Sequence, residues 1–310
     1  MNRSVSHLGA IGFALAGFTF WVLADTCIKL VGQSGLPAYE MVAFLGMFMA
    51  ICLAVYAVAR GQARVLMPHR LDRQLARACL DMANNVCVVV ALRHLSLTMF
   101  YIMIFTAPMT ISLLSAFFLG ESLPWKRALA IATGFAGVVL AVNPFGSARE
   151  GDWIGYSACL VCVACFSVNM VWSRVLTRTE QPESLAFFSG LVTSAMGFLW
   201  MLVAGAGRFG GQVSGTGTTG LTPPLLLGLF GMGMFCALGT LCFYIAVKHT
   251  SAANVSQYHY TQLITGTLVT YLVWHTQPGI FVLLGGALIF GSGLYIALGA
   301  REVVPLTEGS

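Results

Sequence analysis

The sequence predicts an all-α integral membrane protein with ten transmembrane helices, arranged as two inverted five-helix repeats. Three observations lead to this fold class. The 310 residues are 58% hydrophobic and only 9% charged, far below the roughly 25% charged residues of a typical soluble domain. The apolar residues fall into ten windows, each long enough to cross a hydrocarbon layer of about 30 Å as a helix. A stretch of the first half also recurs in the second half about 155 residues later.

The ten windows are separated by connectors that carry charges, Pro or Gly. They lie at Leu8–Leu30, Pro37–Ala59, Leu75–Leu92, Thr98–Leu119, Trp125–Val142, Trp153–Leu176, Ser184–Ala204, Leu225–Val247, Ala252–Trp274 and Gly279–Leu298. The first window runs beyond the length of a signal-peptide core and meets no small-residue cleavage site, so we expect it to stay as a span. Only the connectors 60–73 and 205–224 are long. Because they leave no room for a soluble catalytic domain, function must reside between the helices.

A short internal repeat relates the two halves of the chain. Residues 91–96, Ala-Leu-Arg-His-Leu-Ser, align with residues 246–251, Ala-Val-Lys-His-Thr-Ser, and Cys87 aligns with Cys242. Because each half holds five spans, an odd number, a duplicated second half must enter the membrane from the opposite side. Inverted repeats of this kind are typical of secondary transporters. The expected units are residues 1–145 and 151–301, followed by a short cytoplasmic tail at 302–310.

The distribution of Lys and Arg predicts the orientation of the spans. With ten spans and a cytoplasmic N-terminus, twelve of the 16 basic residues fall on the cytoplasmic side and three fall on the opposite side. Cytoplasmic loops accumulate Lys and Arg. We therefore expect both termini in the cytoplasm, with the chain in the inner membrane of a bacterial cell. Lys29 is the remaining basic residue and lies at membrane depth.

Composition and motifs exclude several classes of function. The formal net charge of +5 arises from short connectors and forms no basic face with interleaved aromatic residues, so no nucleic-acid partner is expected. The nine cysteines lie in or next to apolar windows and are interpreted as packing residues. Cys159, Cys162 and Cys165 have the spacing of half an iron-sulfur motif, but no fourth ligand follows. No metal, cofactor or catalytic residue is therefore predicted.

The segment 108–142 carries the most specific motif of the chain. It places a Pro in the fourth span, Leu-Gly-Glu at the end of that span, with Glu121 as the acid, and a Gly-rich fifth span. This pattern resembles the EamA-type members of the drug/metabolite transporter superfamily. Trp21, followed eight residues later by Lys29, and the link at residues 91–96 are also similar to that family. Within it, the composition resembles bacterial amino-acid exporters, including the aromatic amino-acid branch.

The resemblance implies a carrier that works by alternating access. Its ten helices would surround a central cavity lined mainly by spans one, three, four, six, eight and nine. Side chains that point into this cavity would bind the substrate, and several of these spans offer candidates.

The first span carries two charges at membrane depth. Asp25 and Lys29 lie four residues apart on one helix face, and each costs on the order of 2.5–3.5 kcal/mol to insert. One interpretation is a mutually neutralised pair near the outer end of the span. The other is a pair that faces the cavity and meets both charged ends of a zwitterion. Trp21, one turn earlier, is a candidate aromatic contact for the substrate.

Polar side chains mark spans three and six. Asp81 follows Arg77 by four residues at the start of the third span, and we expect a surface pair with a structural or gating role, with a substrate contact as the alternative. Asn84 and Asn85 lie one turn deeper, and two adjacent amides cannot both face lipid, so at least one should face the cavity. Asn169 lies at a similar depth in span six. Substrate binding and interhelical hydrogen bonding both stay open for these amides.

The ninth span begins with a polar and aromatic run, residues 256–262, that no lipid-facing helix would favour. Tyr258 and Gln262 share one face, and Tyr101 of span four is their rough counterpart in the first half. We expect these three side chains to form opposite walls of the cavity. His259 is interpreted as either a proton carrier or a hydrogen-bonded structural residue.

Spans four, five, eight and ten carry the remaining candidates. Tyr244 in span eight is a further aromatic candidate for the cavity wall. Glu121 ends span four on the cytoplasmic side and either caps the next helix or closes an inner gate. Spans five and ten are rich in Gly, and small residues let helices approach closely. We expect these two spans to pack outside the transport path.

The sequence favours a secondary transporter over a membrane enzyme or a channel. Polar residues occur on several spans, whereas neither an acidic or His cluster at one face nor a filter motif is evident. Lys29 is the one base clearly at cavity depth, which argues against phosphorylated substrates. We expect export of small neutral amino-acid-like metabolites, including aromatic or apolar ones. A drug or other metabolite carrier is the alternative, and an integral-membrane enzyme is a more remote one. The residues leave proton coupling and oligomeric state open.

Overall fold

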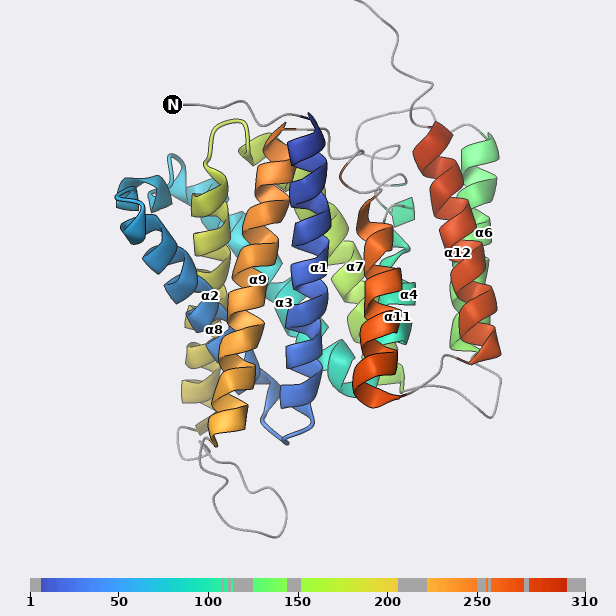
Figure 1. The fold of residues 1–310 in the computed structure, drawn as a ribbon, viewed down its shortest axis with the longest axis horizontal. Helices are drawn as coiled ribbons and strands as arrows, with labels where there is room; N and C mark the ends of the chain where they lie inside the picture. The colour runs from blue at the N-terminus through green and yellow to red at the C-terminus, as the bar shows by residue number, and fades with distance from the viewer. Residues whose placement is uncertain are drawn as a thin grey trace, which may run out of the picture.

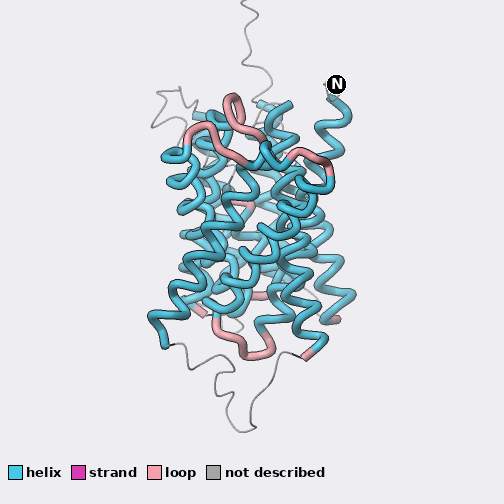
Figure 2. Tube along the Cα trace, turned by 90° about the vertical axis from the view of Figure 1, so that its left-hand side faces the viewer, coloured by secondary structure: helices cyan, strands magenta, loops and turns pink. Residues whose placement is uncertain are grey.

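The computed structural model describes residues 7–107, 109–110, 113, 125–143, 152–205, 222–249, 255, 258–275 and 279–299. In these ranges the chain forms ten α-helices and two short 3-10 turns, and it contains no β-strand. The helices stand side by side as one bundle, with the connections at its two ends (Figures 1 and 2). The predicted all-helical fold class is confirmed.

The first five α-helices lie in the first half of the chain. They are α1 (His7–Gly32), α2 (Ala38–Ala59), α3 (Leu71–His94), α4 (Leu97–Ile104) and α6 (Trp125–Val142), with the 3-10 turn η1 (Ala63–Leu66) before α3. The other five α-helices lie in the second half. They are α7 (Trp153–Leu176), α8 (Pro182–Gly205), α9 (Pro223–His249), α11 (Thr261–Trp274) and α12 (Ile280–Gly299), with the 3-10 turn η3 (Tyr258–Tyr260) directly before α11.

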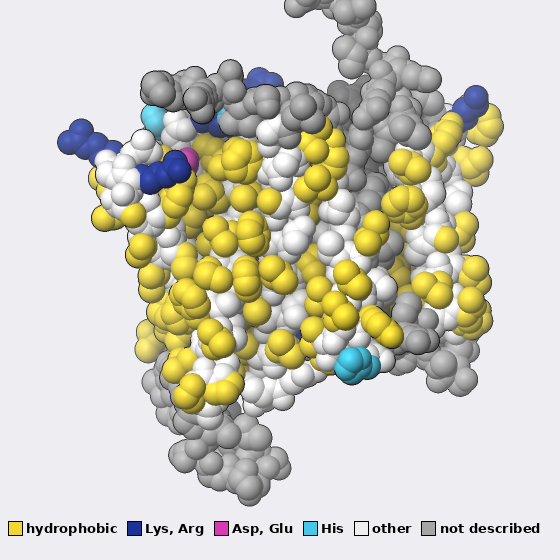
Figure 3. All heavy atoms as spheres, in the orientation of Figure 1, with side chains coloured by type: hydrophobic (Ala, Val, Ile, Leu, Met, Phe, Trp, Pro, Cys, Tyr) yellow, Lys and Arg dark blue, Asp and Glu magenta, His cyan; other side chains and the backbone are white. Residues whose placement is uncertain are grey.

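Six of these helices, α1, α2, α3, α7, α8 and α9, are long and apolar enough to cross a membrane. Large apolar side chains lie exposed on their outer faces, among them Val55, Val58, Leu202 and Val203, each more than 60% exposed. Such a face is unfavourable in water but suits hydrocarbon. Figure 3 shows hydrophobic side chains over one long face of the bundle, with most of the visible Lys and Arg along its upper edge. The chain is a multi-pass membrane protein.

Two predicted spans differ from the structure at corresponding places in the two halves. The fourth was expected to run unbroken from Thr98 to Leu119, but α4 ends at Ile104 and a turn follows at Phe105 and Thr106. Pro108 carries no backbone N–H for the carbonyl of Ile104, which removes one helical hydrogen bond. The ninth was expected to run unbroken from Ala252 to Trp274, but the 3-10 turn η3 (Tyr258–Tyr260) lies directly before α11. Broken helices at matching positions often mark the substrate site of a transporter.

The helices pair across the two halves. The main contacts are α1 with α9, α3 with α7, α2 with α8 and α6 with α12. Each of the first five α-helices can be replaced, in order, by the corresponding helix of the last five. The α1–α9 pair then becomes the α7–α3 pair, and the α2–α8 and α6–α12 pairs map onto themselves. The packing pattern is therefore the same viewed from either half.

Helices α1 and α7 run in opposite directions, as their contacts at the end of α3 make clear. Lys29 near the end of α1 donates a 2.6 Å hydrogen bond to the carbonyl of Leu95, at the end of α3. Asp152, directly before α7, lies 2.9 Å from the ring of His94 at that same end. α1 therefore ends where α7 begins.

Glycines allow the closest of these contacts. A Cβ added to Gly46 of α2 would lie 2.6 Å from the carbonyl oxygen of Gly190 in α8, and one added to Gly137 of α6 would lie 2.8 Å from that of Gly285 in α12. Only a residue without a side chain lets the backbones approach this closely. α6 and α12 pack on each other, and no residue of either helix lines the central cavity in the described part of the chain.

A candidate substrate cavity between the two halves

A cavity lies at the centre of the bundle and is lined by both halves of the chain. Its wall comes from α1, α3, α4, α7, α9 and the η3–α11 segment, with two side chains from α2. These helices correspond to the six spans that the family resemblance implies. Of the candidate side chains, ten line the cavity: Trp21, Asp25, Asp81, Asn84, Asn85, Tyr101, Asn169, Tyr244, His259 and Gln262.

Asp25 brings a carboxylate to the cavity wall from the last third of α1. Its Oδ2 accepts a 2.7 Å hydrogen bond from the hydroxyl of Tyr101 on α4. Lys29, one turn further along α1, does not line the cavity; its Nζ donates to the carbonyls of Leu92 and Leu95 at 3.2 Å and 2.6 Å. Carbonyls at a helix end are a favourable place for a cation. Of the two interpretations of this pair, the one in which both charges face the cavity therefore fits Asp25 and not Lys29.

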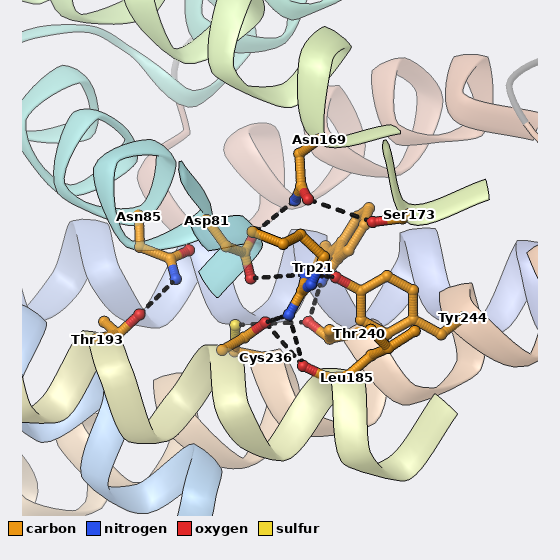
Figure 4. Close-up of polar contacts among 12 residues, drawn as sticks. Trp21, Asp81, Asn85, Asn169, Ser173, Leu185, Thr193, Cys236, Thr240 and Tyr244 are labelled. Atoms are coloured by element: carbon orange, nitrogen blue, oxygen red, sulfur yellow. Dashed lines mark hydrogen bonds and ion pairs between the residues drawn. The ribbon is translucent and has the colours of Figure 1, made fainter. Parts of the chain in front are cut away.

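Arg77 and Asp81 do not form the surface pair that their spacing suggested. The Arg77 side chain is fully buried, and Asp81 is 14% exposed and lines the cavity. Arg77 donates to the hydroxyl of Tyr244 on α9, and Asn169 on α7 donates to Asp81 at 2.8 Å. The correction has a physical reason, because α3 is covered at this depth by α7 and α8, and Tyr244 of α9 reaches Arg77. Figure 4 shows Asp81, Asn169 and Tyr244 converging from α3, α7 and α9.

The two adjacent amides of α3 point toward different neighbours. Asn84 accepts a hydrogen bond from the thiol of Cys162 on α7 at 3.2 Å, and Asn85 donates to the hydroxyl of Thr193 on α8 at 3.2 Å. Both asparagines also line the cavity. Each amide therefore ties two helices together and presents polar atoms to a ligand at the same time.

Aromatic rings form one wall of the cavity. Trp21, Phe166 and Phe243 come from α1, α7 and α9, and their ring centroids lie 5.1 to 6.5 Å apart. The indole N–H of Trp21 donates to the hydroxyl of Thr240 at 3.2 Å. Rings at these distances pack against each other, so they present one continuous apolar surface. Trp21 and Asp25 lie one helical turn apart on α1, which places the apolar wall beside the carboxylate.

The segment that leads into α11 closes the cavity from the second half. The imidazole of His259 is buried and stacks on Phe18 at 4.8 Å, with Phe105 and Phe166 also in ring contact. Gln262 donates to the carbonyl of Phe18 at 3.3 Å. Tyr258 packs against the core outside the cavity wall, contrary to the expectation that it lines the cavity with Gln262.

Several lining residues escaped the sequence analysis. Thr240, Cys236, Cys162 and Phe100 all contribute to the wall, and nothing in their sequence context separates them from ordinary packing residues. Glu121 lies outside the described residues. Within the described part of the chain, no group of three His, Cys, Asp or Glu side chains could hold a metal ion.

The comparison with protein families decides the identity of the fold. Residues 8–143 and, separately, residues 153–298 match the EamA-like transporter family. The chain belongs to this family. Its members are transporters and not enzymes, so the membrane-enzyme alternative no longer applies. The family also matches the resemblance seen in the sequence motif at the end of span four.

Curated relatives of this EamA-like protein align with most of its length. A riboflavin transporter from Brucella anthropi is 24% identical over 85% of this chain and 89% of its own. An S-adenosylmethionine uptake transporter from Rickettsia bellii is 21% identical over 95% of each chain. A pseudopaline exporter from Pseudomonas aeruginosa is 24% identical over 91% of this chain and 93% of its own. A solved crystal structure at 21% identity has a TM-score of 0.66 and covers 95% of this chain and 99% of that chain, which shows the fold.

Proposed function

We propose that this protein is a secondary transporter for a small amino-acid-like metabolite that carries an ammonium group and an apolar or aromatic part. The observation that carries the proposal is the Asp25 carboxylate on the cavity wall. Among the described residues, no Lys, Arg or His nitrogen lies within 4 Å of it. A carboxylate at this depth is costly unless a partner or a function accounts for it. A substrate ammonium is the partner that we propose.

The aromatic wall beside Asp25 is the second feature that would recognise the substrate. Trp21 lies one turn from the carboxylate, and Phe166 and Phe243 extend the apolar surface away from it. An aromatic side chain of the substrate would stack on these rings, while its ammonium meets Asp25. The two features together favour an aromatic or apolar amine over a purely polar one.

A carboxylate on the substrate needs a different partner from the one first expected. Because Lys29 is engaged with the end of α3, the cavity offers amide donors instead. Asn84 and Asn85 line the wall on the α3 side. Amide N–H groups bind a carboxylate more weakly than a base does, so we expect the ammonium to dominate the recognition.

Alternating access between two inverted repeats is the mechanism that we propose. It is supported by the opposite directions of α1 and α7 and by the equivalence of the helix pairs under exchange of the halves. In this arrangement the two halves rock around a site near the midplane. The excess of Lys and Arg in the connectors on one side of the membrane supports an inner-membrane location with both termini in the cytoplasm.

A second candidate function is transport of a larger metabolite or drug. The three relatives support it, because riboflavin, S-adenosylmethionine and pseudopaline are the substrates that their names state. Both candidates use the same cavity and differ in what fills it. Export is our proposal for the direction, and the vesicle experiment below measures it.

The test is transport by purified protein in liposomes. Radiolabelled phenylalanine, tryptophan, riboflavin and S-adenosylmethionine would each be measured, with and without a pH gradient, in vesicles of both orientations. We expect saturable movement of the aromatic amino acids, with a much lower apparent affinity in D25N and an unchanged one in D72N, because Asp72 is exposed in the first turn of α3. Movement of riboflavin or S-adenosylmethionine alone would support the second candidate. Amino-acid transport by D25N with the apparent affinity of the wild type would refute the ammonium site.

A further inference from the structure

Arg77 joins three helices at the end of the bundle where α3 begins. Its guanidinium donates to the hydroxyl of Tyr244 on α9 and, at 2.7 Å each, to the carbonyl of Leu185 and the hydroxyl of Ser189 on α8. The guanidinium also lies over the Tyr244 ring, 5.3 Å from its centroid. We call these contacts between α3, α8 and α9 the seam. Because the Arg77 side chain is fully buried, water does not reach it.

Asp81 connects this seam to the cavity. Its Oδ2 lies 3.9 Å from Nη1 of Arg77, and its Oδ1 accepts a 2.8 Å hydrogen bond from Asn169. Asn169 in turn accepts a 3.2 Å hydrogen bond from Ser173. Asp81 lines the cavity and Arg77 does not. The polar chain therefore runs from the cavity wall into the buried seam.

Further polar contacts lie beyond Arg77, toward the end of the bundle. Gln74 on α3 is fully buried and donates to Ser184 on α8 at 3.1 Å. The buried carboxylate of Glu180 accepts from the backbone N–H groups of His69 and Arg70, at 2.9 to 3.0 Å, just before α3. These contacts close the bundle at this end in successive layers.

The seam is incompletely satisfied, which suits an element that has to open. The Nε of Arg77 is buried without a hydrogen-bond partner in the described part of the chain. Its ion pair with Asp81 is long at 3.9 Å. A buried guanidinium that loses its carboxylate is strongly unfavourable and has to regain water or a new partner. Neutralising Asp81 would therefore drive α3 away from α8 and α9.

We propose that Arg77, Asp81, Asn169 and Tyr244 form a latch that closes the cavity at the end where α3 begins. A cationic group that reaches Asp81 from the cavity competes with Arg77 for the carboxylate and releases the latch. Asp81 is then a coupling residue, and Asp25 is the primary contact for the ammonium. The latch rests on the proposed transport function for the entry of a cation, but its closure at rest does not depend on the substrate.

The chain supplies its own reporter for the opening of this end. Cys236 lies on α9 two turns before Tyr244, lines the cavity and is 8% exposed. A membrane-impermeant maleimide that enters past an open latch would label its thiol, and site-resolved mass spectrometry would separate it from the other cysteines. Vesicles of both orientations would identify the accessible side, with C236S as the blank.

The experiment compares two latch variants with two matched controls. D81N removes the charge, and Y244F keeps the ring over Arg77 but loses the hydroxyl. We expect both to raise Cys236 labelling roughly fivefold or more, the lower end of typical coupling between sites, in one vesicle orientation. D72N, at an exposed carboxylate in the first turn of α3, and Y258F, at a tyrosine outside the cavity, should label like the wild type. Equal labelling of all four variants and the wild type would overturn the latch.

A pair of ligands tests the release step. Tryptamine carries an ammonium, and tryptophol replaces it with a hydroxyl of similar size. We expect tryptamine to raise Cys236 labelling of the wild type and tryptophol to leave it unchanged, whereas D81N should respond to neither. No response of the wild type to tryptamine would overturn release by a cation. Labelling is measured without transport. If the protein moves amino acids but its Cys236 labelling does not change, the latch is refuted while the proposed function stands.

Discussion

The hydroxyl of Tyr101 donates a 2.7 Å hydrogen bond to the Asp25 carboxylate, and this contact joins α4 to α1 across the cavity. Tyr101 lies about one helical turn before the turn at Phe105 and Thr106 that ends α4. The carboxylate is thus held in place by a neutral donor, which leaves its negative charge for a ligand.

The first prediction concerns this pair. In D25N, we expect the apparent affinity for an aromatic amino acid to fall roughly 10- to 100-fold, because a hydrogen bond to a charged group contributes about 1.5–3 kcal/mol. In Y101F the carboxylate remains, so the loss should be about tenfold or less. Concentration-dependent transport in proteoliposomes measures both. A larger loss in Y101F than in D25N would contradict the assignment of Asp25 as the charged contact.

The second prediction concerns Gly266 on α11, which packs against the Tyr101 ring. The approach is so close that an added Cβ would collide with Cδ2 and Cε2 of the ring. G266A should therefore displace the ring and weaken its bond to Asp25, raising the half-saturating substrate concentration several-fold with little change in protein yield. The expected size is that of one hydrogen bond, about 1 kcal/mol.

A matched glycine on α12 provides the control. Gly291 has open space where its Cβ would lie, so G291A should transport like the wild type. Equal effects of G266A and G291A would show that the Tyr101 ring does not transmit the change.

Much of the fold follows from the sequence, because the hydrocarbon layer dictates helix length. The windows at Pro37–Ala59 and Trp153–Leu176 match α2 (Ala38–Ala59) and α7 (Trp153–Leu176) almost residue for residue. The breaks in the fourth and ninth spans were harder to predict, since an apolar window says nothing about local hydrogen bonding. Pro108 was the available signal for the first of them.

The site could be predicted in part. Two adjacent amides and a deep carboxylate are conspicuous in apolar helices, and Asn84, Asn85 and Asp25 all line the cavity. Arg77 was misplaced because its i, i+4 spacing to Asp81 describes only their own helix. What covers that helix is Leu185, Ser189 and Tyr244, more than a hundred residues away in the chain. No local pattern reports such a contact.

The third prediction tests the close approach of α2 and α8. An alanine Cβ at Gly46 would lie 2.6 Å from the carbonyl oxygen of Gly190, and backbone atoms of Ser194 also stand in its way. G46A should lower the stability of the protein by about 1–3 kcal/mol, the usual cost of overpacking. Thermal unfolding in detergent measures the change.

Gly12 of α1 serves as the control for Gly46, since nothing lies within 4 Å of its added Cβ. G12A should be neutral or stabilising by up to about 1 kcal/mol, because alanine favours a helix over glycine. If G46A unfolds at the same temperature as G12A, the backbones of α2 and α8 do not approach as described.

The fourth prediction concerns the exposed start of α7, where Asp152 accepts a 3.0 Å hydrogen bond from the backbone N–H of Gly155 and lies 2.9 Å from His94. The Gly155 bond and then His94 lower the pKa of Asp152 below its ordinary value of 3.8. A carboxyl whose pKa is lower in the folded state stabilises the fold above its unfolded pKa, and this stabilisation is lost as the pH falls through the folded pKa. The melting temperature of D152N should therefore trail that of the wild type near pH 6 and approach it toward pH 3. D152A, which also loses the capping oxygen, should stay below the wild type at both pH values; a gap for D152N that grows in acid would contradict the assignment.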